Sequence, residues 1–276
     1  MDRTENLSRM SVIELRKRFL DGGAALPPDE IMCALENDPR AGARKIASAI
    51  RLRCEKELRE DARLESLLCF EKALWDEGFR NIAGVDEAGM GPLAGPVVAA
   101  TVILPRGCKI SGLDDSKKIP RRDKREGLEG RIKKEALAWA VGRAEAEEID
   151  RLNIYHAGIL AMRRAVEGLN IRPDYLLLDS RAIPEYQCPQ RGIVHGDALS
   201  MSIAAASILA KTCRDRVMLE MDACYPGYGF AAHKGYPTPE HIDALRRLGP
   251  TPIHRLSYAP VREISASLTV KQAEYL

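Results

Sequence analysis

One stretch of the chain, residues 81–104, constrains the fold and the chemistry more than any other. It reads NIAGVDEAGMGPLAGPVVAATVIL: a short apolar run that ends in two acids, a glycine-rich loop, and a second apolar run. This order predicts a strand, a turn and another strand, with Asp86 and Glu87 ending the first strand. Neighbouring side chains of a strand point to opposite faces, so both acids cannot enter the core. Burying even one unpaired carboxylate is costly, and a bound cation would remove that cost.

The loop glycines suggest a ligand as well as a turn. Without a Cβ atom, the backbone at Gly89 and Gly91 can lie directly against a ligand and offer N–H donors. An isolated acid pair beside a glycine is more often a solvated turn. The length and order of this stretch favour a functional site instead.

Composition limits the remaining possibilities. The 276 residues suit one large domain, or one domain with an appendage. A net charge of +2 gives no general attraction to nucleic acid, so any such surface must come from local clusters. No apolar run approaches the ~20 residues that span a bilayer, and no secretion signal opens the chain. Seven cysteines without a CxxC pair predict a reducing, cytoplasmic location and no disulfide framework.

The N-terminal part, residues 1–79, reads as a helical extension, and the catalytic chemistry is expected in residues 80–276. Residues 7–20 have the spacing of a single helix. Residues 40–59 contain seven basic and two acidic side chains. That excess suits either a solvated helix face or a contact with a phosphate backbone.

A DSKK group at residues 115–118 precedes a predicted helix over residues 121–138. Residues 116–134 contain nine basic and three acidic side chains. The hydroxyl of Ser116, the ammonium of Lys117 and nearby backbone N–H groups can hold phosphates. Lysine-rich loops are usually only solvated, so this group alone is a weak signal.

Two further acids follow strong local patterns. Residues 175–178 are continuously apolar and end in Asp179, which predicts a central strand buried on both faces with its acid at the rim. Asp197 directly precedes an Ala- and Ser-rich helix expected over residues 199–218. A plain N-cap is the ordinary role for a single Asp at that place.

Basic and aromatic side chains come together in the C-terminal half. Lys211 and Arg214 lie one helical turn apart and are expected to form a basic edge. Tyr236 stands beside a lysine and a glycine in HKGYPT, residues 233–238. A flat aromatic face next to a cation suits a sugar or base stacked beside a phosphate.

Four groups in this order resemble the motifs of ribonuclease HII, the type 2 ribonuclease H family. They are GVDEAG with GPLAGPVVAA, then DSKK, then LLLDS with HGDALSMSIAAASILAK and RDR, and finally HKGYPT with HRLSYAPV. The helical N-terminal segment resembles an extension of some bacterial members. The resemblance implies an α/β, ribonuclease H-like fold with a mixed five-stranded sheet flanked by helices.

The same resemblance implies an activity. The enzyme would hydrolyse the RNA strand of RNA–DNA hybrids and the phosphodiester 5′ to a ribonucleotide embedded in duplex DNA. The products would carry 3′-hydroxyl and 5′-phosphate ends. Such a reaction removes misincorporated ribonucleotides during DNA replication and repair.

Residue roles follow from the resemblance as well. The backbone of the loop Gly89-Met90-Gly91 would recognise the ribose 2′-hydroxyl, and Tyr236 would stack on the next deoxyribose. Two Mg²⁺ or Mn²⁺ ions, which prefer oxygen ligands, would activate water and stabilise the leaving oxygen. Four carboxylates would hold these ions: Asp86, Glu87, Asp179 and Asp197. Further nucleic-acid contacts are expected from Ser116, Lys117, Lys211 and Arg214.

Two departures from the family pattern leave alternatives open. The arginine that is usual between the loop glycines is Met90 here, so a charged phosphate contact worth roughly 1.5–3 kcal/mol would be lost. Ser180 follows Asp179 where glycine is common. The alternatives are a ribonuclease H-fold nuclease with weakened junction specificity and a catalytically impaired hybrid-binding protein.

The sequence gives one hint of a protein partner. The tail, Gln272-Ala273-Glu274-Tyr275-Leu276, loosely resembles sliding-clamp-binding peptides, although a frayed C-terminus is the more ordinary interpretation. The chain is otherwise expected to act as a monomer, without a membrane partner.

Overall fold

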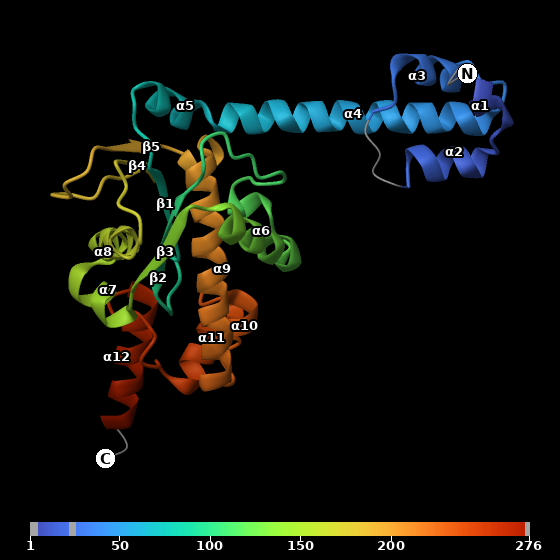
Figure 1. Cartoon of the computed structure of the whole chain (residues 1–276). Helices are drawn as coiled ribbons and strands as arrows, with labels where there is room; N and C mark the ends of the chain where they lie inside the picture. The colour runs from blue at the N-terminus through green and yellow to red at the C-terminus, as the bar shows by residue number, and fades with distance from the viewer. Residues whose placement is uncertain (1–4, 22–25, 274–276) are drawn as a thin grey trace. The chain divides into compact units, whose positions relative to one another are not determined.

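The computed structural model describes residues 5–21 and 26–273, with side chains for residues 7–21 and 26–268, and divides into two compact units (Figure 1). The first unit, Met1–Arg63, is helical, and its core includes Leu15, Leu35 and Ile50. Its helices are α1 (Glu5–Arg9), α2 (Val12–Phe19), α3 (Asp29–Glu36) and most of α4 (Ala41–Leu67).

The single helix expected over residues 7–20 is divided at Ser11, which is the N-cap of α2. The Ser11 hydroxyl accepts a hydrogen bond from the Glu14 N–H at 3.3 Å, and the Glu14 carboxylate accepts one from the Ser11 N–H at 2.7 Å. This reciprocal capping box starts a new helix where the hydrophobic spacing alone continues the old one.

The second unit, Leu64–Leu276, is built on a mixed five-stranded sheet, which confirms the predicted fold class. Its strands are β1 (Ile82–Ala88), β2 (Val97–Ile103), β3 (Ala138–Ala144), β4 (Tyr175–Asp179) and β5 (Gln190–Ile193). They lie in the order β3-β2-β1-β4-β5. β2 runs antiparallel to β1 and β3, whereas β4 runs parallel to both β1 and β5.

Helices cover both faces of this sheet, with α8 on one face and α9 on the other (Figure 1). The longer helices of the unit are α5 (Cys69–Asp76), α6 (Arg122–Glu135), α7 (Ala146–Leu152), α8 (Ile154–Glu167), α9 (Met201–Cys224), α11 (Pro239–Leu248) and α12 (Ala259–Ala273). Short turns of helix are η1 (Ser116–Lys118), η2 (Gly196–Ala198) and α10 (Phe230–His233). No helix in the described ranges is long and apolar enough to cross a membrane.

Two strand glycines let these helices touch the sheet backbone. A Cβ atom added at Gly84 of β1 would lie 2.1 Å from the carbonyl carbon of Ser202 in α9. One added at Gly142 of β3 would lie 2.2 Å from the carbonyl oxygen of Ala161 in α8. No side chain larger than glycine fits at either crossing.

The division into two compact units falls between Arg63 and Leu64, inside α4, whereas the sequence analysis places the end of the helical extension at residue 79. Apolar side chains from Leu64 onward, including Leu74 and Trp75 of α5, share one buried cluster with sheet residues such as Ile82. The helical pattern before β1 is continuous, but its last part packs on the sheet and belongs to that core.

Candidate active site

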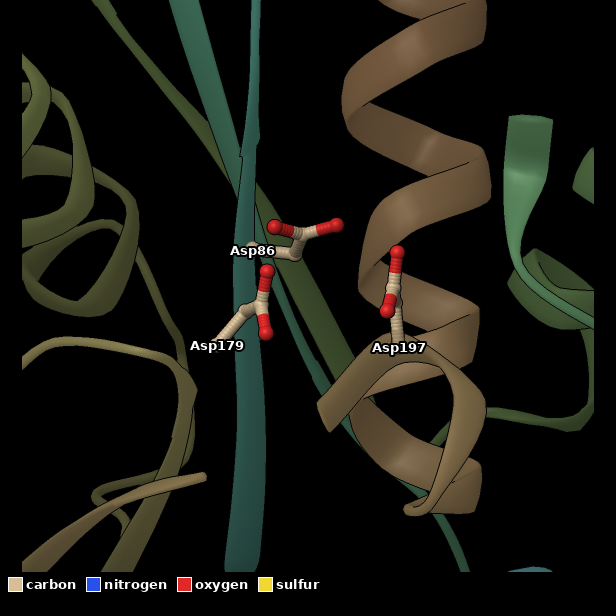
Figure 2. A group of neighbouring side chains, drawn as sticks. All are labelled: Asp86, Asp179 and Asp197. Atoms are coloured by element: carbon tan, nitrogen blue, oxygen red, sulfur yellow. The ribbon is translucent and has the colours of Figure 1, made fainter. Parts of the chain in front are cut away.

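Three carboxylates, those of Asp86, Asp179 and Asp197, are turned toward one shared space (Figure 2). Each offers one oxygen that lies within 4.8 Å of an oxygen from the other two. Parallel pairing of β1 with β4 sets Val85 beside Leu178, so the next residues, Asp86 and Asp179, come together at the rim. Asp197 reaches the same space from η2.

Asp197 is not the N-cap of the helix that follows it. Ser200 has that role, since its hydroxyl accepts a hydrogen bond from the Ile203 N–H at 3.3 Å. The turn before α9 is held to Asp179 instead, whose Oδ1 accepts the Gly196 N–H at 2.8 Å. The Asp197 carboxylate therefore stays available to the cluster.

Glu87 is the one predicted metal ligand outside this cluster. Strand alternation sends it to the opposite face of β1 from Asp86. Its Oε1 lies 3.5 Å from Nη1 of Arg181. Its Oε2 is buried and has no hydrogen-bond partner within the described residues. An unsatisfied buried carboxylate oxygen is unfavourable, so Glu87 keeps an unused ligand atom beside the site.

The electrostatics of the site favour a bound cation. Burial, followed by the charges of Glu87 and Asp179, raises the pKa of Asp86 well above its usual value. Burial also raises the pKa of Glu87 and of Asp179. Several buried anions at this spacing repel one another, and a divalent cation would neutralise them. The donors are all carboxylate oxygens, which suits hard ions such as Mg²⁺ and Mn²⁺.

The DSKK group is present at this site, but its residues differ in exposure. Lys117 has a side chain that is 78% exposed, and its Nζ donates to Asp197 at 2.9 Å. Burial lowers the pKa of Lys117, but the hydrogen bond and charge of Asp197 outweigh this effect and raise it. Ser116 is buried, 2.9 Å from the Ser207 hydroxyl of α9, and thus holds η1 in place.

Arg255 holds the glycine loop through hydrogen bonds to its backbone carbonyls. It is fully buried, and its guanidinium donates to the carbonyls of Gly89 at 2.6 Å, Met90 at 3.0 Å and Gly95 at 2.8 Å. The Tyr258 hydroxyl donates to the Met90 carbonyl at 2.7 Å. Gly89 has φ +98°, a conformation that favours glycine. With its carbonyls held in this way, the loop can offer N–H groups to a ligand.

Tyr236 lies beside the loop and is 42% exposed. A Cβ atom added at Gly91 would meet the Tyr236 ring at 3.9 Å, so the two residues are close neighbours. Arg214, expected at a basic edge, is instead 1% exposed. Its guanidinium donates to the carbonyls of Ala94, Pro96 and Lys234, and lies 5.8 Å from the Tyr236 ring centroid. Burial lowers its pKa to about 10. Arg214 thus positions the residues around Tyr236 and does not face solvent.

Lys211 is the member of that pair that reaches a surface groove. Its ammonium donates to Asp215 at 2.6 Å. Basic side chains dominate the lining of the groove, which includes Lys117, Arg122, Lys211, Arg216 and Lys234 with Glu126 and Asp215. A groove of this composition beside an acidic cluster suits a phosphate backbone.

Sequence reasoning missed two buried histidines, His241 and His254, that hold the backbone of Tyr236 through hydrogen bonds. His254 Nδ1 accepts the Thr251 N–H at 2.9 Å, so the neutral ring carries its proton on Nε2. His254 Nε2 donates to His241 Nε2 at 3.1 Å, and His241 Nδ1 donates to the Tyr236 carbonyl at 2.9 Å. Their position near the HKGYPT and HR motifs was the only available signal.

The sheet order, the helices on both faces and the acidic cluster at the strand ends define a ribonuclease H-like α/β protein. Residues 83–261 match the family model described as Ribonuclease HII, and residues 11–75 match that described as Ribonuclease HII N-terminal domain. The chain belongs to the ribonuclease HII family. It is therefore a ribonuclease H endonuclease acting on RNA–DNA hybrids, in a family that uses divalent metal ions.

Individual relatives agree with this assignment. Ribonuclease HII of Myxococcus xanthus (strain DK1622) is 60% identical over 262 residues, covering 95% of this chain and 89% of the relative. Ribonuclease HII of Desulfitobacterium hafniense (strain Y51) is 51% identical, covering 94% and 98%. Among solved structures, ribonuclease H2 from Pyrococcus horikoshii OT3 is similar with a TM-score of 0.58 and 25% identity, covering 68% of this chain and 99% of that one.

Proposed function

We propose that this enzyme cuts the phosphodiester 5′ to a ribonucleotide embedded in duplex DNA and leaves 3′-hydroxyl and 5′-phosphate ends. The observation that carries this proposal is the placement of the three-aspartate cluster, the glycine loop and Tyr236 on one unit of the fold. An acidic centre alone would suit many nucleases. The loop and the exposed ring add the means to sense a sugar.

In this proposal the carboxylates hold two divalent ions. Asp86 is buried on β1, the central strand of the sheet, and is the candidate for a shared ligand, while Glu87, Asp179 and Asp197 complete the two sites. When bound, such ions supply an activated water and charge neutralisation at the leaving oxygen. Lys117 donates to Asp197 and the Gly196 N–H donates to Asp179, so the chain itself orients these ligands.

Selectivity in this proposal comes from two neighbouring parts. The backbone around Gly89 and Gly91 approaches the ribose closely enough to detect its 2′-hydroxyl, which distinguishes RNA from DNA. Tyr236 then stacks on the following deoxyribose. Together they recognise an RNA-to-DNA junction, as required for removal of single misincorporated ribonucleotides during replication and repair.

A substrate panel tests this proposal. Labelled duplexes would carry no ribonucleotide, one ribonucleotide, or a fully RNA strand, each with Mg²⁺ or Mn²⁺. We expect a single cut 5′ to the lone ribonucleotide, cutting of the hybrid, and no cut in the all-DNA duplex. Cutting of the long hybrid without any cut at the lone ribonucleotide would reject the junction-sensing part.

Met90 supports a second candidate, a ribonuclease H-fold nuclease with weakened junction specificity. An uncharged side chain stands at the centre of the loop. If the loop lacks a cation, Met90→Arg should raise the ratio of junction cutting to hybrid cutting. A binding-only protein is the remaining alternative, and any metal-dependent cut end would exclude it.

The proposal also includes a cytoplasmic location, action as a monomer, and a weak sliding-clamp contact through residues 272–276. The side chains of that tail lie outside the described residues. Retention on immobilised clamp of the full chain, compared with a chain ending at Val270, tests the last of these.

A further inference from the structure

Arg181 lies at the edge of the acidic cluster, two residues after Asp179. Ser180 has φ +59°, and the Arg181 N–H donates to the Asp179 carbonyl at 2.7 Å, so the chain turns sharply as β4 ends. The Arg181 guanidinium lies 5.2 Å from the ring centroid of Tyr155 on α8. Its Nη1 lies 3.9 Å from the Met90 sulfur in the glycine loop.

The lack of a side chain at Gly158 leaves room for this arginine. A Cβ atom added at Gly158 of α8 would lie 3.0 Å from Nη1 of Arg181 and 3.2 Å from the Met90 sulfur. The Tyr155 ring and the Met90 thioether orient the guanidinium through weak contacts, which leave its N–H groups available to stronger acceptors. Arg181 is thus held in a defined place between α8 and the loop.

The guanidinium has donors to spare. It carries five N–H donors in a planar fork, yet within the described residues none makes a hydrogen bond to an oxygen. Its one acidic neighbour there, Glu87 Oε1, is 3.5 Å from Nη1, longer than a charge-assisted hydrogen bond. The side chain is 23% exposed, so a ligand can reach it.

We propose that Arg181 binds a phosphate of the ribonucleotide-containing strand, next to the glycine loop. This inference rests on the proposed function. A planar fork with unused donors matches the oxygens of a phosphodiester, which it can bind at two points. Met90 brings no charge to the loop, and Arg181 brings a cation to its sulfur from the end of β4. The loop therefore does not lack the charged contact that Met90 alone suggests.

Equilibrium binding tests this assignment. Fluorescence anisotropy would measure the affinity for a duplex with one ribonucleotide at several salt concentrations, with Ca²⁺ in place of Mg²⁺ and the duplex checked to be intact. We expect Arg181→Gln to bind about tenfold more weakly at low salt, in line with the loss of one charge-assisted contact. The slope of log affinity against log salt should become shallower by about 0.9, the value for one phosphate.

Three further variants sharpen the test. Arg106→Gln makes the same charge change in an exposed side chain after β2, at the opposite end of β1, and should leave the slope unchanged. Arg181→Lys should keep the slope but lower the affinity, because the charge stays and the fork is lost. Met90→Arg combined with Arg181→Gln should restore the slope, because the two side chains are in contact.

The results separate this inference from the proposed function. Tight binding by both wild type and Arg181→Gln with equal salt slopes would overturn the phosphate contact and leave the proposed function intact. Weaker binding with an unchanged slope would also overturn it, since Arg181 would then act through Glu87. No binding by the wild type would reject both.

Discussion

Burial makes the carboxyl groups at this site bind protons more tightly than exposed carboxyls do, and protons compete with a metal ion for these groups. Burial raises the pKa of Asp86, Glu87 and Asp179, so in the absence of metal the folded chain binds these protons more tightly than the unfolded chain. A raised pKa in the folded state contributes stability that is full below the ordinary carboxyl pKa and is lost as pH rises through the raised value.

Metal ions should therefore stabilise the enzyme more at higher pH. We expect the thermal midpoint in Mg²⁺ minus that in EDTA to grow as pH rises above the ordinary carboxyl pKa, because the ion replaces protons on these carboxyls. Calorimetry at several pH values measures this difference. The Asp86→Asn variant should show a smaller growth, and a difference independent of pH in the wild type would contradict the account.

The His254–His241 pair should make stability rise with pH, opposite to the effect of the metal-free carboxyls. Burial and then the charge of His241 lower the pKa of His254 to about 4. A His with a lowered pKa contributes stability that is full above the unfolded value of about 6.5 and is lost as pH falls toward 4. The loss should amount to about 3 kcal/mol in the free energy of unfolding.

Urea unfolding at pH 7, 5.5 and 4.5 tests this expectation. His254→Gln, which removes the titrating ring, should flatten the profile in this window. His156→Gln, at an exposed position of α8, is the matched control and should keep the wild-type slope. Equal slopes in the wild type and His254→Gln would show that the buried pair does not titrate as expected.

Among the elements, strands were predicted well where the pattern was local. The apolar runs before Asp86 and Asp179 lie in β1 and β4, and the two acids meet where β4 ends because the strands are parallel, although β1 itself continues to Ala88. Arg214 was misplaced because its spacing from Lys211 says they share a helix face but not what covers that face. Local sequence spacing does not show which elements pack against α9. It also does not show which backbone carbonyls Arg255 contacts.

Close contact between sheet and helix gives a clear prediction at Gly84. An added Cβ atom would lie 2.1 Å from backbone of α9, so Gly84→Ala should destabilise the fold by about 3 kcal/mol. Gly127→Ala is the matched control on α6, where nothing lies within 4 Å, and it should stabilise by about 0.5–1 kcal/mol. Denaturant unfolding measures both, and tolerance of Gly84→Ala would contradict the close crossing.

The whole chain consists of two units with separate cores. All the carboxylates of the site, the glycine loop and Tyr236 belong to residues 64–276. The first unit contributes none of them, and its basic excess over residues 40–59 suits a contribution to nucleic-acid affinity.

Removal of the first unit should therefore leave the reaction in place. We expect a fragment of residues 64–276 to fold and to cut the single-ribonucleotide duplex in a metal-dependent manner. Circular dichroism would establish that it is folded, and cleavage at saturating substrate would measure its activity. A folded fragment without any cleavage would show that residues 1–63 take part in catalysis.

The most direct test of the metal-site account is the cleavage rate of a duplex with one ribonucleotide in Mg²⁺, for wild type, Asp86→Asn and Asp174→Asn. Asp174 is an acid at the other end of β4, where it accepts the N–H groups of Arg80 and Asn81. We expect the wild type and Asp174→Asn to cut 5′ to the ribonucleotide at similar rates. Asp86→Asn should be slower by at least about a hundredfold, because several kcal/mol of charge stabilisation are lost. Equal rates for Asp86→Asn and Asp174→Asn would contradict the assignment of this cluster as the catalytic centre.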